Sequence, residues 1–223
     1  MLNNVPDNAI PIQMQPQWQS VSGILQQGSR PYPVVPPGLE SLVEVDELTL
    51  EKMVFQTNGG KILYSVHKGW RCCGTPLILK FKDPCGQEVV RANLLYEGRG
   101  CYSVCKELQV EAPPEHPIGF VKHSYSNGCL QFSIKDDQGK PIFTTQTSAY
   151  AFLEIPIQIC GTHGSHVVSQ ITKTDGKGSQ ILIQFPKDLD AKMKALILGT
   201  FLYMKYWAYS INNRRPSPTS GTF

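Results

Sequence analysis

The sequence predicts a mainly β fold, a barrel or a sandwich, with a single hydrophobic helix near the C-terminus. The first observation is a series of about ten short runs of alternating apolar and polar residues, separated by turn residues at the spacing of all-β domains. The second is a long apolar segment after residue 195, which exceeds the usual length of a strand. The third is a leader rich in Pro and Gln, whose composition is that of a disordered segment.

Composition limits the classes of function. The chain has 223 residues, and 21 Lys and Arg against 18 Asp and Glu give a net charge of +3. This length suits one large domain or two small ones with a packed core. The charge is too small for an electrostatic nucleic-acid binder, so no nucleic-acid partner is expected. The first residues lack the basic and apolar regions of a secretory signal, so the seven cysteines are predicted to be reduced thiols.

Residues 1–37 are predicted to form the disordered leader. Its only charges are Asp7 and Arg30, and it has too little apolar surface to offset the entropy of ordering. Its last part, which contains Pro33, Pro36 and Pro37, has the composition of a polyproline II segment that docks into SH3 or WW domains. The alternative is a spacer that holds the folded domain away from a surface.

Strands are predicted wherever apolar and polar residues alternate between turn residues. The runs 77–81 and 88–90 form one hairpin across the turn 83–86, and the runs 130–134 and 141–145 form another across the turn 136–139. The further predicted strands are a segment near 43–55 and the runs 61–66, 107–111, 118–123, 152–159, 166–172 and 180–185.

The segment 191–211 is predicted to be a helix. Asp188 or Asp190 supplies its N-cap, and the asparagine pair 212–213, followed by Pro216, marks its end. From residue 195 to 211 apolar side chains surround the whole helix, so it must be enclosed by a protein core or by a bilayer. The residues assigned to this membrane or barrel-core helix are Ala195, Leu196, Ile197, Leu198, Phe201, Leu202 and Trp207.

The helix pattern does not separate these two hosts. The apolar part spans about 26 Å at 1.5 Å per residue, slightly less than the roughly 30 Å of bilayer hydrocarbon. Lys205 would cost roughly 2.5–3.5 kcal/mol near a bilayer centre, although a lysine near the helix end can snorkel.

No arrangement of residues predicts an enzyme. His163 and His166 have the spacing of two metal ligands, but no third ligand follows at a suitable distance, so they are interpreted as loop histidines. Cys72 and Cys73 are adjacent without a second cysteine pair, unlike the ligands of a zinc ribbon. The sequence contains no P-loop, nucleophile elbow or dinucleotide-binding fingerprint.

Several segments of the chain share the order and composition of a known family. They are the stretches 36–40, 72–74, 83–89, 107–114 with 117–121, and 183–195, of which the last, Ile183 to Ala195, is the strongest match. Together they resemble the phospholipid scramblase family over essentially the whole chain after the leader.

The resemblance implies a tubby-like fold, which is a closed β-barrel around a hydrophobic C-terminal helix. It implies a scramblase-like domain at residues 38–215, which includes the helix, and a tail at 216–223. The family is credited with calcium-triggered, ATP-independent movement of phospholipids between leaflets, at the cytoplasmic face of the plasma membrane. Membrane phospholipids are therefore the expected partners. The alternative is a non-catalytic, membrane-associated adaptor that binds lipid or protein and recruits partners through the Pro-rich leader.

The family's calcium site is assigned to the stretch that corresponds here to residues 177–188. The candidate ligand positions of this chain are Asp175, Ser179, Ile181, Ile183, Phe185 and Asp188. The family usually has Asp at the first and third positions, where this chain has Lys177 and Ser179. Calcium needs about six or more oxygen ligands, and its affinity follows their charge. We therefore expect Ca²⁺ binding that is weak or absent, and the alternative interpretation is a buried strand that leads to a capped helix.

The resemblance also implies lipid attachment through cysteines. Relatives carry a palmitoylated cysteine run, to which Cys101 and Cys105 correspond here, and Cys72 and Cys73 lie in the other Cys-rich turn. Two acyl chains suffice for stable anchoring, whereas one is marginal. Unmodified thiols are the alternative.

Overall fold

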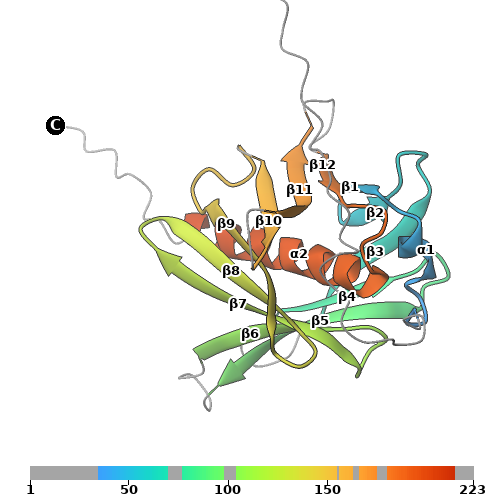
Figure 1. Ribbon diagram of the computed structural model, residues 1–223, viewed down its shortest axis with the longest axis horizontal. Coiled ribbons are helices and arrows are strands. Elements are labelled where there is room, and N and C mark those ends of the chain that lie inside the picture. Colours follow the sequence, from blue (N-terminus) through green and yellow to red (C-terminus); the bar gives the residue numbers. More distant parts are fainter. Residues whose placement is uncertain are drawn as a thin grey trace, which may run out of the picture.

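The computed structural model describes residues 35–69, 77–97, 104–154, 156–162, 166–174 and 180–213. The predicted tail lies outside these ranges, and so does the predicted leader apart from residues 35–37. The described residues form the elements shown in Figure 1: α1 (Glu40–Val43), β1 (Glu47–Glu51), β2 (Val54–Gln56), β3 (Ile62–Gly69), β4 (Ile78–Lys82), β5 (Glu88–Glu97), β6 (Val104–Glu111), β7 (Pro117–Ser126), β8 (Cys129–Asp136), β9 (Pro141–Ser148), β10 (Ile157–Gly161), β11 (Val167–Lys173), β12 (Ile181–Gln184) and α2 (Ala191–Asn213).

The twelve strands of the described residues form one closed antiparallel barrel. Strands that are consecutive in the chain pair with each other from β1 to β12, and β1 closes the barrel by pairing with β12 as well as β2. In the closing pair, Leu48 of β1 lies opposite Ile183 of β12. Closure pairs the strand edges that an open sheet would expose.

Alternation along the strands builds the interior of the barrel. In β8, Leu130, Phe132 and Ile134 are buried, whereas Gln131 between them is exposed. Because successive side chains of a strand point to opposite faces, every second residue points to the inside. The residues whose alternation predicted the strands are therefore the ones that face the helix.

Helix α2 fills the barrel (Figure 1). Leu196, Ile197, Leu198 and Phe201 are fully buried, although successive residues of a helix point to different sides. The barrel therefore encloses the helix on all sides, and the protein core is the host that the structure shows for it. The predicted fold class, a tubby-like closed barrel around a hydrophobic C-terminal helix, is confirmed. In the described part of the chain, no helix combines the length and apolarity that crossing a membrane requires.

The strand predicted at residues 152–159 is wrong in its first half. Residues 149–154 form bends and turns, and β10 begins at Ile157. Phe152 stacks on Phe201 of α2, with ring centroids 6.2 Å apart, and Leu153 has a φ of 64°. Contact with the helix thus overrides an apolar alternation that is typical of a strand.

Candidate functional site

The start of α2 lies in the segment 183–195, the strongest match to the family, and the structure shows how the helix is capped there. The Oδ1 atom of Asp190 accepts a hydrogen bond from the N–H of Lys192 over 2.7 Å. This is the geometry of an N-cap. Of the two predicted caps, Asp190 is the one that the structure shows in this role, and Asp188 lies exposed in the preceding turn.

An aromatic cluster joins the second half of α2 to the barrel wall. The Nδ1 atom of His123 in β7 lies 2.8 Å from the hydroxyl of Tyr203 in α2. The ring centroids of His123 and Trp207 are 4.2 Å apart, and Phe132 of β8 lies edge-on to Tyr203. Burial lowers the pKa of His123 below its usual 6.5, so the imidazole packs as a neutral ring at pH 7.

Lys205 lies beyond the part of α2 that the barrel encloses completely. It is the only charged residue in the chain between Lys194 and the end of α2. Its side chain is exposed, while the protein around its base desolvates the ammonium and lowers its pKa. The other residues assigned to the helix, Ala195, Leu196, Ile197, Leu198, Phe201 and Leu202, are buried, and Trp207 is half-buried.

Residues 181–184 of the predicted calcium window form β12 of the barrel. Ile181, Ile183 and Phe185 are buried, and β12 pairs with β1 on one side and with β11 on the other. Apolar side chains offer no ligand, and a strand paired on both sides has its carbonyl groups in the ladder. Calcium sites need flexible loops of oxygen ligands, so these residues do not fit the ion. Asp175 and Ser179 lie outside the described residues.

Metal ligands do not gather elsewhere in the part of the chain that the structure describes. No group of three or more His, Cys, Asp or Glu side chains there has the arrangement to hold a metal ion. His166 directly precedes β11, and its Nε2 atom is buried and without a hydrogen-bond partner. His163 lies outside the described residues.

The predicted lipidation sites lie in or beside two connections. Cys72, Cys73 and Cys101 are outside the described residues, and Cys105 belongs to β6. The strand register shows where these connections begin: Gly69 of β3 pairs with Ile78 of β4, and Glu97 of β5 pairs with Val104 of β6. Whether the thiols carry acyl chains stays a prediction.

The proline motif is partly built into the folded domain. Pro36 is buried and Pro37 is exposed, and the carbonyl of Pro36 accepts a hydrogen bond from the N–H of Leu39 over 3.0 Å. Pro33 lies outside the described residues. A proline that docks into an SH3 or WW groove must be exposed, so Pro36 would have to leave this position to take part.

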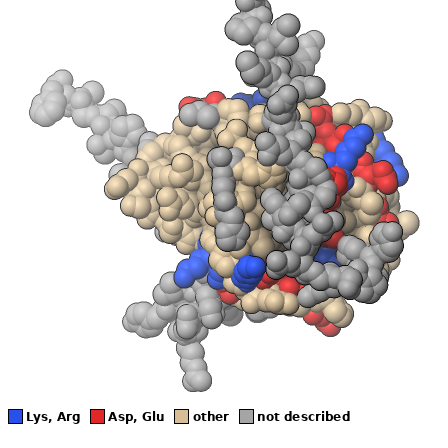
Figure 2. Space-filling view, viewed as in Figure 1, with Lys and Arg blue, Asp and Glu red and all other residues tan. Residues whose placement is uncertain are grey.

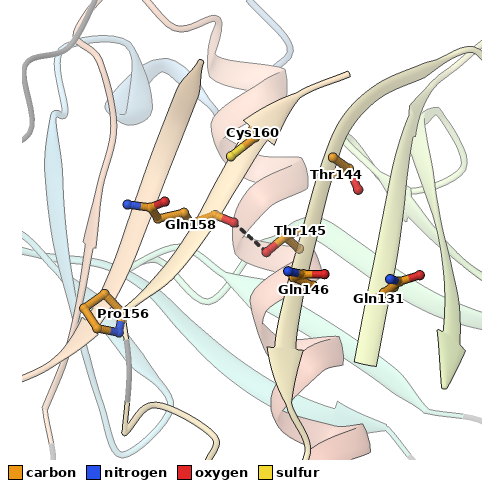
Figure 3. A pocket seen from close by; sticks show the side chains of 7 residues that line it. All are labelled: Gln131, Thr144, Thr145, Gln146, Pro156, Gln158 and Cys160. Atoms are coloured by element: carbon orange, nitrogen blue, oxygen red, sulfur yellow. Dashed lines mark hydrogen bonds between the residues drawn. The ribbon is translucent and has the colours of Figure 1, made fainter. Parts of the chain in front are cut away.

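A pocket of about 490 Å³ lies where β9 and β10 diverge on the outside of the barrel. Figure 3 shows its lining side chains, which come from β8, β9, β10 and the residue before β10, with α2 behind the strands; they are Gln131, Thr144, Thr145, Gln146, Pro156, Gln158 and Cys160. The hydroxyl of Thr145 donates to the carbonyl of Gln158 over 2.7 Å and bridges the gap. The sequence analysis missed this site, because its neutral amide and hydroxyl groups carry no motif.

Comparisons with known proteins agree with this architecture. Residues 65–210 match the profile of the family described as Scramblase. The chain is 24% identical to phospholipid scramblase 2 of Bos taurus, covering 79% of this chain and 72% of that protein. It is 25% identical to phospholipid scramblase 1 of Mus musculus (86% and 71%), and 23% identical to phospholipid scramblase family member 5 of Homo sapiens (89% and 88%).

One solved structure resembles the fold. The crystal structure of a protein from Arabidopsis thaliana matches with a TM-score of 0.50 and 15% sequence identity. The match covers 72% of this chain and 90% of that chain. At this identity the likeness concerns the barrel-and-helix architecture alone.

Proposed function

The chain belongs to the scramblase family, whose profile covers residues 65–210, and on this premise we propose that it moves phospholipids between the two leaflets of a membrane. The observation that carries the proposal is this match, together with curated relatives named phospholipid scramblases that align with most of the chain. The movement is bidirectional and dissipates differences between leaflets, so it is downhill and needs no ATP. No residue acts as a catalytic acid, base or nucleophile, because no covalent bond changes.

We place the protein at the cytoplasmic face of the plasma membrane, with phospholipids as its partners. In this proposal, acylation of Cys101 and Cys105, or of Cys72 and Cys73, would anchor the protein, because two acyl chains hold a protein stably at a bilayer. The proline segment that ends at Pro37 serves as a spacer or as a ligand for SH3 or WW domains.

Calcium is a weak effector at most in this proposal. The family places a site at 177–188, but Ile181, Ile183 and Phe185 of that window are buried apolar residues, and β12 is paired on both sides. Lys177, in the place of a carboxylate, would repel a cation as well as removing a ligand. We therefore assign no step of lipid movement to Ca²⁺.

A second candidate function follows from the enclosure of α2. A lipid path along this helix would require contact between the helix and the bilayer. The consecutive residues Leu196, Ile197 and Leu198, which point to different sides of the helix, are all fully buried inside the barrel. This observation favours a non-catalytic, membrane-associated protein that binds lipid or protein through the outside of the barrel. In that case the protein would bind vesicles without exchanging their leaflets.

A reconstitution assay separates the two candidates. The full chain is inserted into vesicles that carry a fluorescent phospholipid in both leaflets, and an impermeant quencher is added. Lipid movement brings the label of the inner leaflet to the quencher, so the protected fraction falls below that of protein-free vesicles. A protected fraction that is unchanged after correction for leakage contradicts lipid movement and leaves the binding protein. The same assay in the presence of Ca²⁺ and in the presence of a chelator tests whether Ca²⁺ changes the rate of lipid movement.

A further inference from the structure

One end of the barrel carries exposed tyrosines. Tyr125, Tyr150 and Tyr209 are 45%, 48% and 68% exposed. Tyr125 lies near the β7–β8 turn, and its hydroxyl is 2.8 Å from that of Tyr150 in the β9–β10 connection. Tyr209 belongs to the last part of α2. We call the surface of these three residues the tyrosine end.

Contacts within the barrel place the three tyrosines at the same end. His123 of β7 packs against Trp207 of α2 with tilted rings, which sets the relative position of the strand and the helix. Tyr125 follows His123 in the direction of the β7–β8 turn, and Tyr209 follows Trp207 in the direction of the helix end. Both chain segments therefore continue past this contact to the end of the barrel at which α2 stops.

The segment that carries Tyr125 and Tyr150 holds few charges at this end. Between residues 123 and 153 the only charged residues are Lys135, Asp136, Asp137 and Lys140, which lie at or beside the β8–β9 turn at the opposite end of these strands. Figure 2 shows this side of the molecule as a broad surface without charged groups, in contrast to the mixed charges elsewhere. The exposed Glu154 follows directly, and Lys205 is exposed on α2.

The described residues that border two connections, and the end of α2, also lie toward this end of the barrel. The β3–β4 connection leaves after Gly69, beside Lys68, whose ammonium lies 5.9 Å from the ring of Tyr206 in α2. The β5–β6 connection leaves after Glu97, which pairs with Val104 at the start of β6, and the ladder between β6 and β7 begins at Leu108 opposite Val121. Asn213, the last residue of α2, lies at the same end.

We propose that the tyrosine end is the face that contacts the headgroup region of a phospholipid bilayer. Tyrosine has an apolar ring and a polar tip, and it is enriched where protein meets the membrane–water interface. Uncharged surface there costs little to dehydrate, and the exposed Lys205 complements anionic headgroups. A protein partner would also accept tyrosines, but the membrane association proposed for the chain and the exposed ammonium of Lys205 favour a bilayer.

This inference rests on the proposed membrane association and adds the orientation of the barrel. Co-sedimentation measures the binding of the full chain, purified without acylation, to vesicles. One set of vesicles contains phosphatidylcholine alone, and the other also contains phosphatidylserine. The variants are Tyr125→Ser with Tyr209→Ser, and Lys205→Ala. The control is Ile62→Ser, because Ile62 is 48% exposed and starts β3, whose other end approaches α2. Thermal unfolding confirms that each variant is folded.

The tyrosine variant is expected to bind both kinds of vesicle several-fold more weakly, whereas Ile62→Ser binds as the parent does. Lys205→Ala should lose about fivefold on vesicles with phosphatidylserine, since that is the effect of one basic side chain near an anionic surface. A photoreactive phospholipid should label the peptides around Tyr125 and Tyr209 rather than the β8–β9 turn.

Equal binding by the tyrosine variant and the parent overturns the orientation, and so does labelling confined to the β8–β9 turn. If the tyrosine variant binds vesicles normally but abolishes a dimer seen by ultracentrifugation, the face serves a second copy of the chain and the bilayer proposal fails. The protein could bind vesicles through the tyrosines and yet move no lipid between leaflets. That result would contradict the proposed lipid movement and would support this inference.

Discussion

Lys194 of α2 donates a hydrogen bond from its Nζ atom to the carbonyl oxygen of Leu42 at the end of α1, over 3.0 Å. The same ammonium donates to the carbonyls of Val43 and Lys187 over 3.0 and 3.2 Å. Lys194 is fully buried, and desolvation lowers its pKa. One buried side chain thus joins the start of the central helix to α1 and to the turn that precedes α2.

We expect Lys194→Met to lower the free energy of unfolding by about 3 kcal/mol, because it leaves three carbonyl groups without their donor in a buried site. Denaturant unfolding measures the effect. Lys192→Met is the matched control, since Lys192 lies in the same turn and is half-buried, and it should change the stability by less than about 0.5 kcal/mol. Equal stability of the two variants would show that the Lys194 contacts contribute nothing.

Gly119 of β7 is a position at which the barrel wall comes very close to the helix. A Cβ atom there would lie 2.4 Å from the carbonyl oxygen of Lys135 and 2.7 Å from a methyl group of Leu196. Gly119→Ala should therefore destabilise the protein by about 1–3 kcal/mol or more through overpacking. Gly59→Ala is the control, because the nearest atom to its Cβ, in Thr57, is 3.8 Å away. A Gly119→Ala protein as stable as Gly59→Ala would contradict the close approach of β7 and α2.

His123 makes the stability depend on pH. Its pKa is below 6.5 in the folded protein because burial disfavours the charged ring. Between this lowered pKa and the value of about 6.5 in the unfolded chain, the unfolded chain binds more protons than the folded protein does. The free energy of unfolding should then fall as the pH drops through 6.5 and level off below the folded pKa. His123→Gln should flatten this part of the profile of melting temperature against pH, whereas His116→Gln, at an exposed residue, should not. If the melting temperature of His123→Gln changes with pH as that of the parent does, other groups cause the pH dependence of stability.

A disulfide can test whether lipid movement requires α2 to leave the barrel. A Cβ atom on Gly199 would lie 4.0 Å from the Cβ of Ala92 in β5, within the range of disulfide-bonded cysteines. We expect the oxidised Ala92→Cys, Gly199→Cys protein to lose lipid movement in the vesicle assay and to regain it with a reductant. The single variant Ala92→Cys should respond to neither treatment. Full activity of the oxidised protein would place the lipid path outside the barrel.

Calcium titration tests the predicted loss of the family's site. Isothermal titration of the full chain should give weak binding or none, because Lys177 and Ser179 stand where the family resemblance implies carboxylates. Lys177→Asp with Ser179→Asp should bind more tightly, since it restores two negative ligands. Tight binding by the unchanged chain would show that other residues supply the oxygens.

Local pattern was sufficient for most of the barrel. The alternation in β8 predicted Leu130, Phe132 and Ile134 as one face, because the period of two holds wherever one face of a strand is buried. It misled at Phe152, where the apolar partner is Phe201, a residue distant in the sequence. Lys194 was also missed as a core residue, since nothing in the local sequence identifies the carbonyl groups of α1 as its partners.

Apolar residues around the whole of α2 require that it be enclosed, and this follows from the chain alone because an all-round apolar helix is unstable in water. Which medium encloses it depends on contacts between distant segments: β1 must pair with β12 before there is an interior, and Leu48 and Ile183 are far apart in the sequence. The gathering of Tyr125, Tyr150 and Tyr209 at one end likewise exists only in the closed barrel, since it depends on strand register and on the direction in which α2 enters.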